Sequence, residues 1–203
     1  MDPRLVAVIF LGYLIGAIPF GLVVGKLTRG VDVREYGSGK MGATNVLRIL
    51  GTKVGVLVFA ADLAKGAVAV LLSRAILDTH AAAVVAATAA IVGHNWPVYI
   101  RFWGGRGVTT ALGGLSALAP LVAVGCLGIG VVIIAWSRYV SLGSMAGALS
   151  GGIIMTPLVA LDRQPVEFLV YALIASCLII FQHRDNISRL RSGTERRLGG
   201  GRE

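Results

Sequence analysis

Residues 5–25 read LVAVIFLGYLIGAIPFGLVVG, and this apolar run has the length of about 20 residues that a helix needs to cross a hydrocarbon core. The run is too long for the apolar region of a secretory signal peptide, and little positive charge precedes it. Further apolar segments follow at residues 54–75, 81–100, 108–136, 139–161 and 166–182. The sequence therefore predicts an all-α, polytopic integral membrane helical bundle.

The composition of the whole chain supports this fold class. The 203 residues are 56% apolar and 14% charged, and the mean hydropathy is +0.80, whereas soluble domains carry about a quarter charged residues. The net charge of +9 could suggest nucleic acid, but a nucleic-acid-binding protein needs a basic face on a water-soluble body, and most of this chain has no such face. We therefore expect the positive charge to contact the membrane surface, and we expect no nucleic acid. We predict a single membrane domain over residues 1–203, in which residues 193–203 form a short basic cytoplasmic tail.

The number of spans depends on residues 108–136, which form one long helix or, with a break at Pro120, two short spans. The alternatives are therefore six or seven spans. With seven, and with the N-terminus outside, the cytoplasmic side receives all but four of the nineteen Lys and Arg residues. The exceptions are Arg4, Lys65, Arg74 and Arg163. We expect about seven transmembrane helices with the C-terminus in the cytoplasm.

The first cytoplasmic loop reads REYGSGKMGATNVLR at residues 34–48. This composition is poor helix material, but glycines let consecutive backbone N–H groups converge on an oxyanion. The candidate backbone donors lie at Gly37, Gly39 and Gly42, and the candidate side-chain donors are Ser38, Thr44, Asn45 and Arg48. An ordinary solvated loop is the alternative interpretation.

A second basic loop, FWGGRGVTT at residues 102–110, repeats this design. Gly104, Gly105 and Gly107 flank Arg106, and the next span begins at Val108, so the positive end of a helix dipole should point at the loop. The pattern predicts a phosphate cradle. It is not a Walker P-loop, because GxxxxGK[ST] is absent, so nucleotide hydrolysis has no support.

Other polar residues lie at the end of the last span and inside the spans. In HRDNISRL, residues 183–190, His183 and Asn186 are three residues apart and should share a helix face, although a lone histidine at a helix end is more often a cap than a catalyst. Asp62 and Lys65 should pair or face a polar cavity, because an isolated charge at mid-bilayer costs about 2.5–3.5 kcal/mol. For His94, a satisfied structural role is the expected one.

In their order along the chain, these motifs resemble the PlsY-type acyl-phosphate:glycerol-3-phosphate acyltransferases of bacterial membranes. The matching blocks are GSGKMGATNVLR at 37–48, DLAKG at 62–66, GHNWPVYIRFWGGRGVTT at 93–110, and HRDNI with GTE within 183–195. Two residues depart from the family pattern: Lys40 stands where Asn is usual, and Arg106 where Lys is usual. Both departures add or preserve positive charge, so anion binding should survive, and the planar Arg106 fork changes only the hydrogen-bond geometry.

The resemblance implies a seven-helix membrane enzyme that moves a fatty acyl group from acyl phosphate to the sn-1 hydroxyl of glycerol 3-phosphate, giving lysophosphatidic acid and phosphate. This is the first step of membrane phospholipid synthesis, and acyl-CoA is not used. The implied catalytic residues are Ser38, Arg48, His183 and Asn186. The implied substrate-binding residues are Gly39, Thr44, Asn45, Lys65, Gly104, Gly105, Arg106 and Gly107. Glu195 corresponds to a structural acidic residue.

The resemblance also implies the partners and the location. The expected partners are acyl phosphate, glycerol 3-phosphate and membrane lipids, with no cofactor, no metal and a monomer as the working expectation. The expected location is the bacterial inner membrane, with the active site on the cytoplasmic face. The general base is left open between His183 and a phosphate oxygen of a substrate.

Two rival functions come from other classes. A transporter for a phosphorylated solute would also carry intramembrane charges such as Asp62 and Lys65, but the chain has no internal repeat and its motifs gather on one face. A CDP-alcohol phosphotransferase needs a cluster of acidic metal ligands, and the cytoplasmic segments show no such pattern.

Overall fold

The computed structural model describes residues 2–199. Within this part of the chain the regular structure is entirely helical, with no strand. The chain forms two compact units, Met1–Leu118 and Ala119–Glu203. Of the basic tail expected at residues 193–203, residues 200–203 lie outside the described part.

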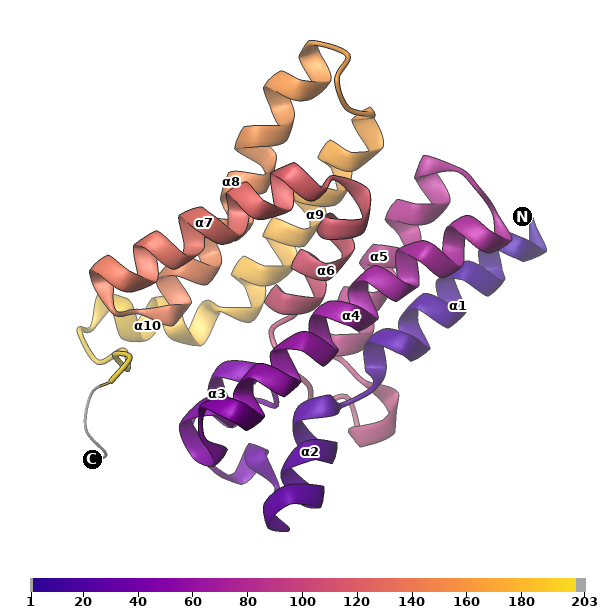
Figure 1. The fold of residues 1–203 in the computed structure, drawn as a ribbon. Coiled ribbons are helices and arrows are strands. Elements are labelled where there is room, and N and C mark those ends of the chain that lie inside the picture. The colour runs from indigo at the N-terminus through magenta and orange to yellow at the C-terminus, as the bar shows by residue number, and fades with distance from the viewer. Residues whose placement is uncertain (1, 200–203) are drawn as a thin grey trace. The chain divides into compact units, whose positions relative to one another are not determined.

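The first unit consists of six α-helices and two short 3₁₀ helices among the described residues (Figure 1). They are α1 (Pro3–Ala17), α2 (Phe20–Arg29), η1 (Val33–Glu35), α3 (Ala43–Leu50), α4 (Thr52–Ile76), α5 (His80–Asn95), η2 (Val98–Ile100) and α6 (Val108–Leu118). Helices α1, α4 and α5 pack against one another, and α6 packs against α4 and α5. At the start of α1, the Asp2 carboxylate accepts a hydrogen bond from the Arg4 N–H at 2.8 Å, which caps the helix.

Glycines set the closeness of α1 and α5. Gly12 and Gly16 of α1 face the backbone of Ala86 and Ala90 in α5. A methyl group added at Gly12 would lie 2.7 Å from the Ala86 carbonyl oxygen, which is closer than van der Waals contact allows. The spacing of small residues therefore serves helix packing, as such patterns do in membranes.

The apolar run that opens the chain is two helices, not one. Pro19 lies between α1 and α2, where its missing N–H and fixed φ interrupt the helical hydrogen bonds. The Ile18 carbonyl at this break accepts hydrogen bonds from the Phe20 N–H at 3.1 Å and from Lys65 Nζ at 3.0 Å. Helix α2 then ends at Gly30, whose φ of 68° is the left-handed conformation that commonly ends helices.

The second unit contains α7 (Pro120–Ser137), α8 (Val140–Ala160), α9 (Val166–Gln182) and α10 (Arg184–Arg191). Helix α8 packs against both α7 and α9. Helices α9 and α10 meet at His183 with a bend of 60°. His183, the predicted catalytic histidine, therefore lies at the corner between the long helix α9 and the short polar helix α10.

The predicted break at Pro120 is confirmed, because α6 ends at Leu118 and α7 begins at Pro120. Among the described residues, five helical segments are long and apolar enough to cross a membrane, when α1 with α2 and α5 with η2 each count as one segment, or six if α9 and α10 form one bent span. Helix α6 has 11 residues, which is about 16 Å at 1.5 Å per residue and about half of a 30 Å hydrocarbon core. The all-α class is confirmed and every predicted span is helical, but α6 alone is too short to cross.

Candidate active site

The first glycine-rich loop is held at both ends by buried apolar side chains. Val33 and Met41 flank the loop and are 0% and 1% exposed, packed with Val46 and Val58 in one apolar cluster. Anchors on both sides fix where the loop begins and returns. The segment between Val33 and Met41 is therefore a shaped part of the fold and not a loosely solvated connection.

An ion pair stiffens the entry to this loop. Arg34 Nη2 lies 2.7 Å from Asp32 Oδ2, and Arg34 Nε donates to Asp32 Oδ1 at 3.0 Å. These charged hydrogen bonds outweigh the partial burial of the carboxylate and hold the pKa of Asp32 below its usual range. The two parallel bonds also fix the guanidinium plane.

Asn45 holds the centre of the loop. Its side chain is buried, and its Oδ1 accepts a hydrogen bond from the Ser38 N–H at 2.8 Å. Its Nδ2 donates to the carbonyl oxygens of Val33 at 2.8 Å, Lys40 at 2.8 Å and Tyr36 at 3.2 Å. The amide contacts that the structure assigns to Asn45 are thus all within the loop, so it shapes the anion site from behind. A direct contact between Asn45 and substrate stays a prediction.

The loop runs into a helix that the sequence reading did not expect. Helix α3 (Ala43–Leu50) includes residues 43–48 of the 34–48 segment predicted to be poor helix material, so the prediction is wrong for that part of the segment. Helix α3 is stabilised by docking, because it buries Val46 and its Leu47 packs against Gly55 of α4; packing of this kind decides most short helices. Gly42 caps α3 without a side-chain hydrogen bond, so the helix N-terminus offers backbone N–H groups to an anion. Thr44 lies in its first turn and Arg48 in its last.

The second loop folds back on the end of α5. The Gly105 N–H donates to the His94 carbonyl oxygen at 3.0 Å, and Gly104, Gly105 and Gly107 are buried. Gly107 has a φ of 77° and leads directly into α6 at Val108, so the predicted helix N-terminus behind the loop is confirmed. Arg106 is half-buried between these glycines.

The structure brings the two loops together within the first unit. The Arg34 guanidinium lies 5.6 Å from the centroid of the Trp103 ring, a cation–π distance. Ile100, just before the second loop, packs against the apolar cluster that anchors the first loop. Both predicted anion-binding segments therefore contact each other in this unit.

A buried ion pair lies inside the helices of the first unit. Lys65 Nζ is 2.8 Å from Asp62 Oδ1, and both side chains are 2% exposed, so the predicted pairing is confirmed. The Lys65 ammonium also donates to the Ile18 carbonyl and lies 5.7 Å from the Phe20 ring centroid. His94 Nδ1 faces the same carboxylate oxygen at 3.6 Å. These contacts of Lys65 are internal, and its predicted role in substrate binding stays a prediction.

His183, the predicted catalytic histidine, occupies the bend between α9 and α10 in the second unit and is 2% exposed. Its Nδ1 lies 2.8 Å from the Ile179 carbonyl oxygen. Because a carbonyl only accepts, this contact assigns the hydrogen of the neutral ring to Nδ1 and the lone pair to Nε2. The fold thus sets the tautomer in which Nε2 can accept a proton.

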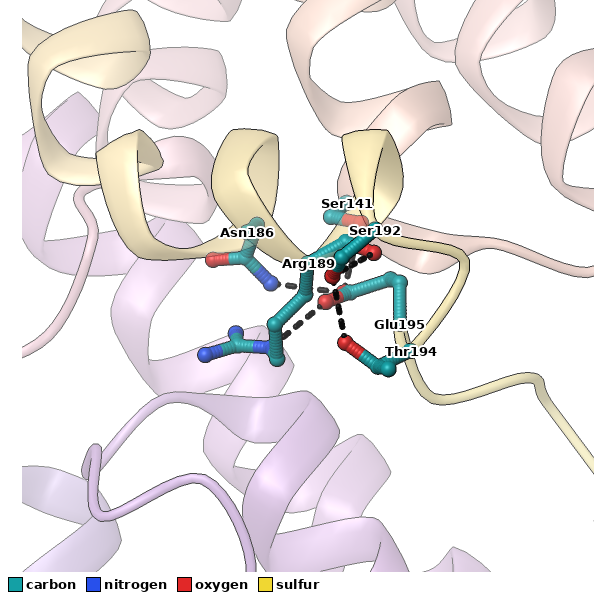
Figure 2. Close-up of polar contacts among 6 residues, drawn as sticks. All are labelled: Ser141, Asn186, Arg189, Ser192, Thr194 and Glu195. Atoms are coloured by element: carbon teal, nitrogen blue, oxygen red, sulfur yellow. Dashed lines mark hydrogen bonds and ion pairs between the residues drawn. The ribbon is translucent and has the colours of Figure 1, made fainter.

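Glu195 is the centre of a polar cluster beside α10 (Figure 2). Its carboxylate accepts hydrogen bonds from Asn186 Nδ2 at 2.6 Å, Ser141 Oγ at 2.7 Å and Arg189 Nε at 2.8 Å. Burial of the carboxylate opposes its ionisation, but these three donors outweigh burial and keep the pKa of Glu195 below its usual range. Glu195 is therefore an ionised anchor, which fits the structural role that the resemblance implies.

The anchor also orients Asn186. Because an ionised carboxylate can only accept, the Asn186 NH₂ group faces Glu195 and its Oδ1 faces away. This Oδ1 is buried and has no hydrogen-bond partner among the described residues. Asn186 therefore presents an open acceptor, as a group that binds a hydroxyl would.

Sequence reasoning missed two members of this cluster. Ser141 lies 54 residues before Glu195, and nothing in the sequence around it indicates the contact. Arg189 is three residues after Asn186 on the same helix, a spacing that could have suggested it. In the described part of the chain, no group of three or more His, Cys, Asp or Glu side chains could hold a metal ion.

The fold and these sites place the protein in the class of all-helical membrane proteins whose glycine-rich loops and helix N-termini can bind phosphate groups. Comparison with known proteins then gives the family. The family model for glycerol-3-phosphate acyltransferase matches residues 6–193. This chain belongs to the glycerol-3-phosphate acyltransferase family, as its motifs predicted.

Individual relatives agree over nearly the whole chain. A glycerol-3-phosphate acyltransferase of Thermoanaerobacter sp. (strain X514) is 43% identical over 189 residues, covering 93% of each chain. One from Synechococcus elongatus (strain ATCC 33912 / PCC 7942 / FACHB-805) is 42% identical over 202 residues, covering 96% of this chain and 94% of the relative. The crystal structure of PlsY (YgiH), an integral membrane glycerol 3-phosphate acyltransferase, in its glycerol 3-phosphate form, superposes with a TM-score of 0.88 at 40% identity and covers 96% of both chains. The integral membrane class is thereby confirmed.

Proposed function

We propose that this protein transfers a fatty acyl group from acyl phosphate to the sn-1 hydroxyl of glycerol 3-phosphate, releasing lysophosphatidic acid and phosphate. The observation that carries this proposal is the match to the glycerol 3-phosphate form of PlsY, which extends over 96% of this chain. A second PlsY structure, the lysophosphatidic acid form, matches with a TM-score of 0.87. The two crystallised forms correspond to an acceptor and a product of this reaction.

Both substrates of the proposed reaction carry phosphate, so the site needs two anion-binding elements. The first loop, with Ser38, Gly39, Thr44 and Arg48, and the second loop, with Arg106, supply cations and backbone donors. Gly104 and Gly105 bring the second loop close to α5, and Gly107 places it at the N-terminus of α6. The family resemblance favours the second loop for glycerol 3-phosphate, and we assign acyl phosphate to the first.

The proposed chemistry needs no covalent acyl-enzyme, because acyl phosphate is already a mixed anhydride with a good leaving group. The sn-1 oxygen attacks the acyl carbonyl carbon, the bond from that carbon to the phosphate oxygen breaks, and phosphate leaves with the electron pair. Donors in the loops stabilise the charge that develops on phosphate and on the carbonyl oxygen. Holding the two substrates in register supplies much of the remaining rate.

Two acceptors in the second unit suit the attacking hydroxyl. Asn186 Oδ1 is oriented by Glu195, and His183 Nε2 carries the lone pair that the Ile179 contact assigns to it. The proton of the hydroxyl goes either to His183 or to a phosphate oxygen of a substrate. If His183 is the base, His183→Ala lowers kcat with little change in KM; if a phosphate oxygen is the base, kcat largely survives.

The decisive experiment measures phosphate release from palmitoyl phosphate by purified protein, with and without glycerol 3-phosphate, beside Ser38→Ala. This variant keeps the backbone hydrogen bond from the Ser38 N–H to Asn45 Oδ1, so the loop keeps its shape and only the hydroxyl is lost. We expect release that depends on glycerol 3-phosphate and that Ser38→Ala abolishes, whereas Thr28→Ala, at an exposed site on α2, leaves it intact. No release by folded wild-type protein would overturn the proposal, and solute uptake into vesicles would then test the transporter.

The proposed location is the bacterial inner membrane, with the N-terminus outside, the active site on the cytoplasmic face and the protein a monomer. The basic loops and α10 support this orientation through the preference of Lys and Arg for the cytoplasmic side. In a variant without Cys126 and Cys177, a membrane-impermeant maleimide should label Arg163→Cys in intact cells and leave Ser192→Cys unlabelled. The reverse labelling would contradict the orientation.

A further inference from the structure

The second glycine loop, residues 104–107, packs closely against two consecutive buried residues at the end of α5. His94 is 3% exposed and Asn95 is 2% exposed. If Gly105 carried a methyl group, its three nearest neighbours would all be atoms of the His94 ring, led by Nε2. If Gly107 carried one, its nearest neighbour would be Asn95 Oδ1 at 2.7 Å. The two side chains therefore fill the space directly behind the two glycines.

A backbone hydrogen bond also joins the second loop to the end of α5. The Gly105 N–H donates to the His94 carbonyl oxygen at 3.0 Å, so this N–H is engaged inside the protein. The loop then has the backbone from Arg106 onward, and the start of α6, to present to an anion. The shape of this part depends on how closely Gly105 lies on His94.

The ring itself is held from behind. His94 Nδ1 lies 3.6 Å from Asp62 Oδ1, and the same oxygen lies 2.8 Å from Lys65 Nζ. Lys65 donates in turn to the Ile18 carbonyl at the break between α1 and α2. One edge of the ring therefore lies beside the buried ion pair of α4, which is tied to the α1–α2 break, and the other edge lies against the loop.

His94 does not fit two other roles. Among the described residues it belongs to no group of three or more side chains that could hold a metal. Its Nε2 faces the inner side of Gly105, so the loop covers the ring. A role that acts through the loop is the one that the contacts support.

We propose that His94 is a positioning residue for glycerol 3-phosphate: its ring, braced by Asp62, sets the conformation of the 104–107 loop that binds the phosphate of this substrate. The inference rests on the proposed function, because it assigns that substrate to this loop. Through the loop, His94 determines the affinity for the acceptor substrate and leaves the binding of acyl phosphate unaffected.

The first test is a kinetic comparison of His94→Ala with His80→Ala, a change at the exposed, opposite end of α5. His94→Ala should raise KM for glycerol 3-phosphate by about tenfold, with kcat and KM for acyl phosphate changed by less than about threefold. His80→Ala should leave all three unchanged. A His94→Ala enzyme with normal KM for glycerol 3-phosphate, or with both KM values raised alike, would overturn the inference.

The second test uses the close contact between Gly105 and the ring. Gly105→Ala should reduce kcat/KM for glycerol 3-phosphate by about a hundredfold, since overpacking displaces the loop. Because the obstructing atoms belong to the His94 side chain, Gly105→Ala combined with His94→Ala should recover about tenfold relative to Gly105→Ala alone.

Gly104→Ala provides the matched control. A methyl group there would meet the His94 carbonyl oxygen, Pro97 Cδ at 2.5 Å and the Asn95 carbonyl oxygen at 2.7 Å, none of which His94→Ala removes. Its defect should therefore persist in the double variant. Equal recovery at both positions, or at neither, would overturn the inference.

The two proposals fail in distinguishable ways. If Gly105→Ala does not yield folded protein, the same pairs are compared by purification yield and melting temperature. Rescue by His94→Ala at Gly105 alone then supports the contact, and the absence of rescue overturns it. Wild-type protein without glycerol-phosphate-dependent release would overturn the proposed function together with the inference, whereas active wild-type protein without selective rescue would overturn the inference alone.

Discussion

The glycine loops of the first unit and the α9–α10 corner of the second unit present polar chemistry by different means. In the loops, backbone groups are placed by side chains behind them, such as Asn45 behind the first loop and His94 behind the second. At the corner, side chains themselves are placed by hydrogen bonds, as Glu195 places Asn186 (Figure 2). A site made of backbone should therefore be sensitive to added volume and to loss of its buried supports. A site made of side chains should be sensitive to removal of single polar atoms and to pH.

The largest effect on stability should come from the buried pair that supports the first unit. Lys65→Met leaves Asp62 as an uncompensated charge and should lower the free energy of unfolding by about 3–5 kcal/mol. Melting temperature in detergent measures this loss. Replacing both partners, Asp62→Leu with Lys65→Met, should restore much of the stability, because a well-packed apolar pair often equals a buried ion pair.

The same double variant sharpens the role of Lys65. If Lys65 only supports the fold, the restored protein should retain kcat, with a raised KM for glycerol 3-phosphate because the carboxylate beside His94 is gone. If its ammonium also binds substrate, as the resemblance implies, the stable double variant should be inactive. A double variant as unstable as Lys65→Met would contradict the pairing argument.

Removing the support of the first loop should have the next largest effect. Asn45→Ala takes away hydrogen bonds to four backbone groups. Because Nδ2 has two hydrogens, these contacts amount to about three full bonds, which at about 0.5–1.5 kcal/mol for each bond is about 1.5–4.5 kcal/mol of loop stability. Activity should fall by about a hundredfold or more, with the rise in KM seen for acyl phosphate. Asn45→Asp keeps the acceptor for the Ser38 N–H but turns a carboxylate oxygen toward three carbonyl oxygens in a buried site, so it should be at least as damaging as Asn45→Ala. Normal activity of Asn45→Ala would show that the anchors at Val33 and Met41 suffice.

At the side-chain corner, Glu195→Gln should lower kcat by about tenfold, because a neutral amide no longer dictates which way Asn186 turns. The pH dependence separates this effect from general damage. The folded pKa of Glu195 lies below its ordinary value, so its stabilisation is complete above the ordinary glutamate pKa and is lost as pH falls through the folded pKa. Melting temperatures of the wild type and Glu195→Gln should differ at neutral pH and converge in acid. A constant difference down to the lowest pH would contradict an ionised Glu195.

The smallest effect should come from Ser141→Ala, which removes one of three donors to Glu195 and should cost about 1 kcal/mol of stability. The matched control is Ser188→Ala, at an exposed position of α10, which should leave the melting temperature unchanged. An effect of Ser141→Ala as large as that of Glu195→Gln would show that Ser141 has a role beyond the hydrogen bond.

The parts of this molecule that could be predicted from sequence are those governed by local rules. Apolar length located the spans, Pro120 marked a helix boundary, and the i,i+3 spacing of Asp62 and Lys65 indicated their pairing. Contacts between distant residues could not be predicted, since the bond from Ser141 to Glu195 and the bracing of Lys65 by Ile18 depend on tertiary packing. Helix α3 was missed for the same reason. Its start is glycine-rich, and its apolar face is stabilised by packing against α4, which the sequence alone does not show.

The placement of Asp62 and Lys65 on a single helix has a consequence for biogenesis. Because the two charges are one turn apart on α4, they neutralise each other before any neighbouring helix is present. The nascent segment can leave the translocon laterally as a neutral dipole, without waiting for a counter-ion from another helix. The contacts of Lys65 with Ile18 and of Asp62 with His94 form only when α4 packs against its neighbouring helices. Membrane insertion of α4 can therefore precede its tertiary packing.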